Sequence, residues 1–233
     1  MDKLSVNMIF LSIQGEGILT GCPTVFIRLA LCNLRCSFCD TRETWDWDHY
    51  KKEDEITEMT IDEVAAEINK YYSQLGYEPN VVITGGEPLL QQKILYKLIP
   101  KLLCHKVEVE TNGTIAPNVQ MCEMVDNFNV SIKLNNSGNA EKARLKPYAI
   151  ESFVSRPNAY FKFVVSTPDD LKEILDLKDL YNIPRDKILL MPEGKTESEI
   201  QSKLQWLSEI CVKNGFILSN RLQVMTWGDK RGV

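Results

Sequence analysis

Residues 24–41, which read TVFIRLALCNLRCSFCDT, join an apolar run to a loop that carries three cysteines. The run Thr24–Ala30 is rich in β-branched and apolar residues, a composition typical of a buried strand. Cys32, Cys36 and Cys39 follow at once with CxxxCxxC spacing. The sequence therefore predicts a strand whose carboxyl end bears three thiols on one short loop.

Similar apolar runs recur along the chain and predict further strands at Val6–Leu11, Val81–Thr84, Val107–Glu110, Val130–Leu134, Phe161–Val165, Ile188–Met191 and Leu222–Thr226. Helical patterns lie between these runs. Such alternation indicates an α/β fold with mostly parallel strands and right-handed crossovers, either an open sheet or an incomplete TIM-type β/α barrel. In parallel folds of this kind, functional loops follow the carboxyl ends of the strands.

The helices are predicted from caps and from apolar spacing. Two of them begin at capping boxes, Thr60 with Glu63 and Thr196 with Glu199. Within the segment 89–103, a helical repeat predicts a buried stripe made of Leu90, Ile94, Leu98 and Leu102. The polar stretch Trp45–Glu58 is the best candidate for a mobile insertion.

Composition limits the protein class. The chain has 233 residues, 44% of them hydrophobic, which favours a single domain over residues 1–233. A formal charge of −5 gives no overall attraction to nucleic acid or to anionic membranes. No run approaches the roughly 18 apolar residues of a membrane span, and no signal-peptide pattern is visible. We therefore expect a cytoplasmic protein with neither kind of partner.

The cysteine loop favours iron–sulfur chemistry. Thiolates hold such clusters, and three ligands for four irons leave one iron open to bind another group, so the spacing predicts a 4Fe-4S site. A structural zinc site would normally be closed by a fourth Cys or His, and the nearest, His49, lies ten residues beyond Cys39. A non-catalytic metal-binding module and three unligated cysteines remain the alternatives.

The loop resembles the signature of the radical S-adenosylmethionine (SAM) superfamily. Residues 84–88 read TGGEP and are similar to the superfamily's GGEP motif for the methionine amino group of SAM, although a turn with proline at the first helical position is the alternative. The resemblance implies that SAM chelates the open iron. It also implies reductive cleavage of SAM to methionine and a 5'-deoxyadenosyl radical that abstracts hydrogen from a substrate.

Further motifs narrow the family. Ile13–Gly17 reads IQGEG, Arg28 precedes the cysteine loop, residues 39–41 read CDT, and the chain stops with WGDKRGV. Together they resemble the 7-carboxy-7-deazaguanine synthases from about Asn7 to Val233. This resemblance implies conversion of 6-carboxy-5,6,7,8-tetrahydropterin to 7-carboxy-7-deazaguanine with loss of ammonia, Mg²⁺ as a further cofactor, an electron donor such as flavodoxin or ferredoxin, and a homodimer.

The resemblance also implies roles for individual residues. Cys32, Cys36 and Cys39 would hold the cluster and Thr41 the Mg²⁺, which we expect to order only when substrate is bound. The SAM contacts would be Phe38, Cys39, Asp40, Gly85, Gly86, Glu87, Ser131, Ile132, Lys133, Met191, Pro192, Glu193 and Gly194. The substrate contacts would be Ile13, Gln14, Gly15, Glu16, Arg28, Thr84 and, through the terminal carboxylate, Val233, so that an N-terminal strand segment and the C-terminal tail complete the pocket.

Side-chain chemistry agrees with several of these roles. Arg28 offers a planar fork of donors for a substrate carboxylate, and Gln14 and Glu16 can read amide and amino groups. The family pattern is broken at two places, where Ile132 stands for proline and Met191 for glutamine. Trp45 and Trp47 either cover the substrate or lie on a surface loop.

One other enzyme family shares the cysteine spacing. Glycyl-radical activating enzymes, such as the activase of anaerobic ribonucleotide reductase, are similarly compact and act on a protein partner. The IQGEG segment, Arg28 and the WGDKRGV terminus favour a small-molecule substrate over this alternative.

Overall fold

The computed structural model describes residues 2–233, in which nine strands form one sheet with the order β3-β1-β2-β4-β5-β6-β7-β8-β9. Strand β1 runs antiparallel to β2 and β3, and every other neighbouring pair is parallel. The strands are β1 Lys3–Ile13, β2 Pro23–Leu29, β3 Thr57–Thr60, β4 Asn80–Gly85, β5 Val107–Thr111, β6 Asn127–Val130, β7 Ala159–Val165, β8 Ile188–Pro192 and β9 Ile217–Leu218. The predicted α/β fold with mostly parallel strands is confirmed.

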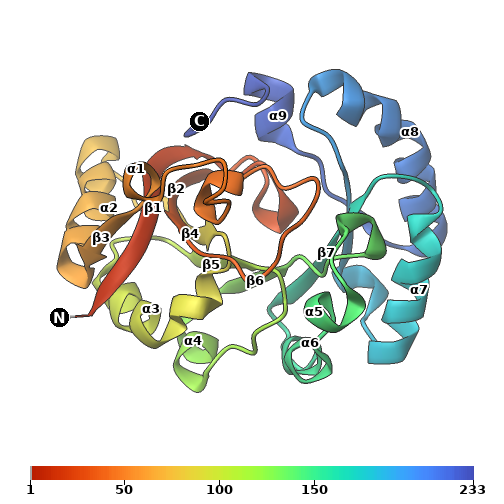
Figure 1. Ribbon diagram of the computed structural model, residues 1–233, viewed down its shortest axis with the longest axis horizontal. Coiled ribbons are helices and arrows are strands. Elements are labelled where there is room, and N and C mark those ends of the chain that lie inside the picture. Colours follow the sequence, from red (N-terminus) through yellow and green to blue (C-terminus); the bar gives the residue numbers. More distant parts are fainter. Residues whose placement is uncertain (1) are drawn as a thin grey trace.

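The helices lie mostly on the outside of the curved sheet, which gives the incomplete barrel that the sequence predicted (Figure 1). They are α1 Lys52–Glu55, α2 Ile61–Leu75, α3 Gln92–Leu98, α4 Val119–Met124, α5 Glu141–Arg144, α6 Pro147–Val154, α7 Asp170–Tyr181, α8 Glu197–Asn214 and α9 Leu222–Trp227. Both predicted capping boxes are present, at the first residues of α2 and α8. After α9 the chain returns to the side of the barrel formed by β1 and β2 (Figure 1).

The two faces of the sheet differ in polarity because side chains alternate along a strand. The outer face packs on the helices and forms the main core, with Ile27, Ile83, Val109, Val130 and Phe161 from five neighbouring strands. The inner face carries polar residues at the adjoining positions, namely Arg28, Thr84, Glu110, Asn129 and Lys162. Arg28 pairs in register with Thr84, and Glu110 with Asn129, so these side chains form one polar row.

Two predicted strands are wrong in position or type. Leu222–Thr226 is helical and belongs to α9, because β9 already occupies the edge of the sheet and a short apolar run does not distinguish strand from helix. Strand β6 ends at Val130 instead of beginning there. Its polar Asn127 and Asn129 face the barrel interior, so the segment does not read as an apolar strand. Ile132 and Leu134, which lie beyond the strand, pack into the core from a loop.

Two smaller expectations also fail. Leu90 is 44% exposed, because residues 88–91 form a 3-10 helix and α3 begins only at Gln92, which breaks the helical repeat. The stretch Trp45–Glu58 is not a separate insertion, since it contains α1 and enters the edge strand β3, whose Glu58 pairs with Ser5 of β1.

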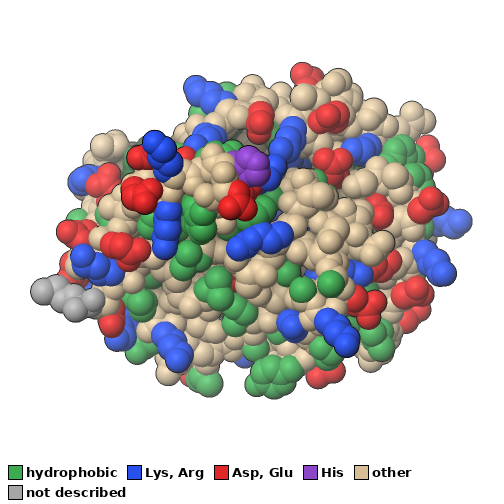
Figure 2. Space-filling model, viewed as in Figure 1, with side chains coloured by type: hydrophobic (Ala, Val, Ile, Leu, Met, Phe, Trp, Pro, Cys, Tyr) green, Lys and Arg blue, Asp and Glu red, His purple; other side chains and the backbone are tan. Residues whose placement is uncertain are grey.

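Acidic and basic side chains are interspersed over the face shown in Figure 2 and do not gather into a patch of one sign. Among residues 2–233, no helix is both long and apolar enough to cross a membrane. All seven cysteines are free thiols.

Candidate active site

A cavity lies over the polar inner face at the carboxyl ends of the parallel strands. It brings together residues that are far apart in the sequence and that come from the loops after β1, β2, β4, β5, β6 and β8. Of the predicted site residues, those that line it are Ile13, Gln14, Gly15, Glu16, Arg28, Cys32, Cys36, Phe38, Cys39, Asp40, Thr41, Thr84, Gly85, Gly86, Ser131, Lys133, Met191, Glu193, Gly194 and Val233. Glu87, Ile132 and Pro192 do not line it.

The cysteine loop leaves β2 through a residue with a rare backbone conformation. Leu31 has φ 76°, in the left-handed region that non-glycine residues seldom adopt and that carries a conformational cost for a side chain such as leucine. Two backbone hydrogen bonds hold it there, from its own amide to Thr44 O at 2.7 Å and from the Glu87 amide to Leu31 O at 2.8 Å. The loop that presents the thiols is thereby tied to the segment 84–88.

Both glycines of residues 84–88 lie where this segment approaches the end of β2 and the cysteine loop very closely. Gly85 has φ 137°, and a Cβ built there would lie 2.0 Å from Leu29 O. A Cβ on Gly86 would lie 2.1 Å from Leu31 O and 2.9 Å from the Cβ of Cys32. Glycine is therefore needed for the backbone of one cavity loop to approach the other.

Glu87 is an internal anchor with no exposed surface. Its carboxylate accepts hydrogen bonds from the Leu89 amide at 2.9 Å, the Thr111 hydroxyl at 2.8 Å and the Asn112 amide at 2.7 Å. Burial raises the pKa of Glu87 in spite of these hydrogen bonds, which act in the opposite direction. The residue joins the loops after β4 and β5.

The three thiols share the cavity wall. Burial raises the pKa of Cys32 to about 11, and it also raises the pKa of Cys36. Within residues 2–233, no group of three or more His, Cys, Asp or Glu side chains is arranged to hold a single metal ion. The thiolates of a 4Fe-4S cluster bind separate irons and need not converge on one point.

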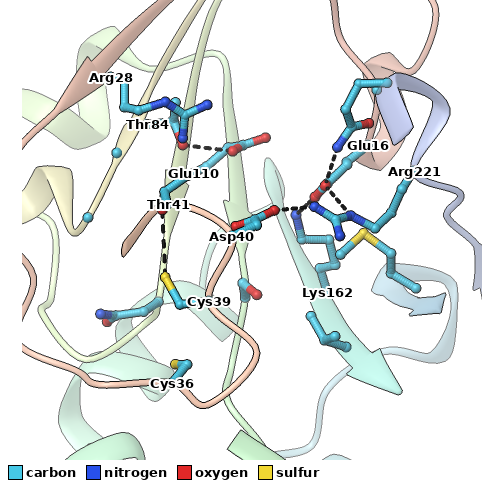
Figure 3. Close-up of a pocket in the computed structure, with 18 of the residues that line it drawn as sticks. Glu16, Arg28, Cys36, Cys39, Asp40, Thr41, Thr84, Glu110, Lys162 and Arg221 are labelled. Atoms are coloured by element: carbon cyan, nitrogen blue, oxygen red, sulfur yellow. Dashed lines mark hydrogen bonds and ion pairs between the residues drawn. The ribbon is translucent and has the colours of Figure 1, made fainter. Parts of the chain in front are cut away.

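A chain of charges crosses the cavity opposite Arg28 (Figure 3). The Glu16 carboxylate pairs with Lys162 of β7 and with Arg221, whose Nε lies 3.2 Å away, and it accepts a hydrogen bond from Gln223 at 2.8 Å. Arg221 also pairs with Asp40 of the cysteine loop. Burial would raise the pKa of Glu16, but the charges of Lys162 and Arg221 hold it well below its usual value.

Two carboxylates of β5, Glu108 and Glu110, lie on the inner face of the sheet, and Glu110 lines the cavity. Gln14 donates to Glu108 at 2.6 Å and to Glu110 at 3.1 Å. The Thr84 hydroxyl also donates to Glu110, at 2.8 Å (Figure 3). Glu108 is fully buried and also accepts a hydrogen bond from Asn127. Burial, together with the charge of Glu110, raises the pKa of Glu108 to about 8.

A Glu108→Gln variant is expected to become more stable relative to the native protein as the pH rises. The unfolded chain loses the Glu108 proton near pH 4.5 and the folded chain only near pH 8, so this group lowers native stability across that window. Urea unfolding at several pH values from 4.5 to 9 measures the difference, which should grow up to about pH 8 and then level off. A difference that does not vary with pH would contradict the raised pKa.

Arg28 projects from β2 into the cavity and stacks over Phe10, with its guanidinium carbon 5.8 Å from the ring centroid. Its guanidinium makes no hydrogen bond or ion pair with any of residues 2–233. The chain end lies in the same wall, where Val233 lines the cavity. Arg231 holds this tail by pairing with Glu55 at 2.8 Å and with Glu43 at 3.4 Å.

Comparison with known proteins agrees with this geometry. Residues 27–184 match the radical SAM superfamily. The chain is 38% identical to the 7-carboxy-7-deazaguanine synthase of Pyrobaculum aerophilum, over 99% of this chain and 97% of the relative. The chain belongs to this family. It is also 33% identical to the synthase of Halobacterium salinarum, over 97% of this chain and 91% of the relative.

A solved structure supports the fold of this 7-carboxy-7-deazaguanine synthase family member. QueE from Escherichia coli superposes with a TM-score of 0.64 at 24% identity, over 94% of each chain. Membership of the radical SAM superfamily implies a 4Fe-4S cluster and SAM as cofactors. The residues fit these groups, because three thiols, which can supply cluster ligands, line one cavity that also holds polar groups at the ends of several strands.

Five residues in or beside the site of this synthase family member were not predicted from the sequence, namely Glu108, Glu110, Lys162, Arg221 and Gln223. One signal for the first three was available, because charged residues inside central strands, in VEVET (107–111) and AYFKFVV (159–165), are rare unless they face a polar site. Arg221 immediately precedes the segment Leu222–Thr226, which was predicted as a strand, and Gln223 lies within it. Nothing in the sequence therefore placed them against Glu16.

Proposed function

We propose that this protein converts 6-carboxy-5,6,7,8-tetrahydropterin to 7-carboxy-7-deazaguanine with loss of ammonia. The observation that carries the proposal is the placement of Arg28. Its guanidinium stacks on Phe10, has no hydrogen-bond or ion-pair partner among residues 2–233, and faces the cavity that is also lined by the three cysteines. A substrate carboxylate held there would bring the rest of a bicyclic ring into the space above Glu110.

Cys32, Cys36 and Cys39 would hold the cluster, and with SAM bound it supplies a one-electron reductive cleavage that yields the 5'-deoxyadenosyl radical. Ser131 and Lys133 are joined by a 2.7 Å hydrogen bond and line the cavity on the side of Cys36. We propose that they contact SAM together with Gly85, Gly86 and the wall residues Phe38, Asp40, Met191, Glu193 and Gly194. Glu87 would support these contacts through the carboxylate that anchors the loops, and Ile132 and Pro192 would do so through the backbone.

The proposed substrate contacts divide by chemistry. Arg28 can donate two parallel hydrogen bonds to the substrate carboxylate. An ionised Glu110 accepts hydrogen bonds but donates none, so it suits the N–H groups of the pterin edge. The Gln14 side chain already bonds Glu108, Glu110 and the Glu16 amide, so we propose that it orients Glu110. The Glu16 carboxylate is likewise engaged by Lys162, Arg221 and Gln223 and fixes the wall beside the substrate.

Several finer features belong to the same proposal. Thr41 lines the cavity and would bind Mg²⁺ together with the substrate carboxylate, so tight Mg²⁺ binding by protein and SAM alone would contradict this arrangement. The carboxylate of Val233 would contact the substrate. We further propose that residues 1–233 form a single domain and that two copies assemble as a cytoplasmic homodimer. A flavodoxin or a ferredoxin would supply its electrons.

The test is anaerobic reconstitution of the cluster, reduction, and incubation with SAM and 6-carboxytetrahydropterin, followed by mass spectrometry. We expect 5'-deoxyadenosine and 7-carboxy-7-deazaguanine together, and neither from a Cys36→Ala variant. Formation of 5'-deoxyadenosine without the deazaguanine would contradict the substrate while leaving the chemistry class intact.

An Arg28→Ala variant is expected to raise the KM for the pterin about 10- to 100-fold, because hydrogen bonds to a charged group contribute about 1.5–3 kcal/mol. Cluster absorbance should be unchanged, since Arg28 touches none of the cysteines. An Arg28→Lys variant keeps the charge but loses the planar fork, so its KM should lie between the two. Unchanged KM in both variants would remove Arg28 from the pocket.

A further inference from the structure

Each of the three cysteine sulfurs has an N–H group pointed at it from outside the CxxxCxxC motif. The indole Nε1 of Trp45 donates to Cys39 Sγ at 3.3 Å, and the amide Nδ2 of Asn139 donates to Cys36 Sγ at 3.2 Å. Asn112 Nδ2 lies 4.0 Å from Cys32 Sγ, a weaker contact. The first two have ordinary lengths for hydrogen bonds to sulfur.

Trp45 is held in this position by a contact to its ring and by a hydrogen bond from its backbone. The guanidinium of Arg35 lies 4.6 Å from the centroid of its ring, and Arg35 itself donates to Cys32 O at 2.8 Å. The Trp45 amide donates to Arg42 O at 3.0 Å. Arg35 of the cysteine loop thus helps to position the indole that donates to Cys39 of the same loop.

Asn139 is fixed in a similar way, although it comes from the loop after β6. Its Oδ1 accepts the Arg35 amide at 2.9 Å, and its Nδ2 also lies 3.2 Å from the Ser137 hydroxyl. The amide is therefore oriented with its N–H side toward Cys36 by contacts at both ends. Arg35 connects the two donors, through its ring contact with Trp45 and its backbone contact with Asn139.

We infer that Trp45 and Asn139 set the reduction potential of the cluster by donating hydrogen bonds to two of its ligand sulfurs. Hydrogen bonds to sulfur are one of the factors that determine iron–sulfur potentials. Reduction adds negative charge that the sulfurs share, so an N–H donor stabilises the reduced state more than the oxidised one. The inference rests on the proposed cluster at Cys32, Cys36 and Cys39.

The redox step concerned is a one-electron change. The cluster goes from the 2+ to the 1+ state by accepting a single electron from a low-potential donor protein of the flavodoxin or ferredoxin class. Dithionite with redox mediators replaces that donor in the experiment. No protein bond forms or breaks, and both hydrogen bonds persist in the two states.

The test is a redox titration of the reconstituted cluster without SAM or substrate, followed by electron paramagnetic resonance. Trp45→Phe removes the N–H while keeping an aromatic ring for Arg35, and Asn139→Ala removes the second donor. For each variant we expect the equilibrium constant for reduction to fall about tenfold, which lowers the potential by about 59 mV for one electron. Trp47→Phe is the matched control and should titrate like the native protein.

The outcomes separate the inference from the proposed function. Failure of the native protein to assemble a 4Fe-4S cluster would overturn the cluster assignment itself. A cluster that forms in native and variant proteins with equal potentials would overturn the role of the two donors. If Trp45→Phe does not fold, Asn139→Ala decides, and exchangeable-deuterium couplings in the native reduced cluster report the N–H donors directly. Absence of those couplings would also overturn it.

Discussion

An Arg221→Met variant is expected to lose about 3 kcal/mol of unfolding free energy, near the lower end of the range for breaking a buried ion pair. Arg221 is only 7% exposed and lies between Glu16 and Asp40. Without it, the Glu16 carboxylate stays buried with a single cation, Lys162. The remaining Lys162 pair and the partial exposure of Asp40 keep the loss from being larger.

Urea unfolding of the native, Arg221→Met and Arg221→Lys proteins measures this effect. Lysine keeps a charge but cannot bridge two carboxylates with one planar group, so we expect partial rescue. Arg231→Met is the matched control, because the Arg231 side chain is 47% exposed, so water screens its ion pairs, which should contribute less than about 1 kcal/mol. Equal losses for Arg221→Met and Arg231→Met would contradict the internal role of Arg221.

The loss should also depend on pH with a definite sign. The cations lower the pKa of Glu16 in the folded protein, so the stability that they contribute is present above the ordinary pKa of glutamate. It is lost progressively as the pH falls from that value, where the unfolded chain takes up the proton, to the lowered pKa of folded Glu16, where the folded protein takes it up as well. The gap between native and Arg221→Met proteins is therefore expected to narrow in acid.

Much of the fold could be predicted because the apolar pattern reports the outer face of the sheet. Ile27, Ile83 and Phe161 pack on helices, and they lie in runs that the sequence marks as strands. The pattern fails where the inner face is polar, as at Asn127 and Asn129 of β6. In that strand polar residues that face the cavity alternate with apolar ones, so no continuous apolar run marks it. The strand was therefore predicted at the next apolar run, Val130–Leu134.

The site was predictable only where a motif is local in sequence. The three cysteines, Gly85 and Gly86 each lie within a short stretch whose spacing carries the signal. Arg221, by contrast, contacts Glu16 across 205 residues, and Asn139 reaches Cys36 across 103. Such contacts depend on how the barrel closes, which no local pattern encodes.

A Gly86→Ala variant is expected to lose about 3 kcal/mol of unfolding free energy, at the upper end for overpacking, and to assemble less cluster than the native protein. The added methyl would lie 2.1 Å from Leu31 O and 2.9 Å from the Cβ of Cys32. The first neighbour is backbone, so no side-chain rotation relieves the clash. The Leu31–Cys32 segment must move, and it is already held in an unusual conformation.

The matched control is Gly76→Ala at the end of α2, where φ is 73° and nothing lies within 4 Å of the new methyl. That change meets only the cost of a left-handed alanine, about 1–2 kcal/mol, and should leave cluster content unchanged. Thermal unfolding and the iron and sulfide content after reconstitution distinguish the two variants. If Gly86→Ala binds a full complement of iron, the Cys32 loop tolerates displacement, and the close approach of the two loops is not what positions the first cysteine. If instead cluster content falls in Gly86→Ala alone, the glycine acts by placing a cluster ligand and not only by permitting the turn.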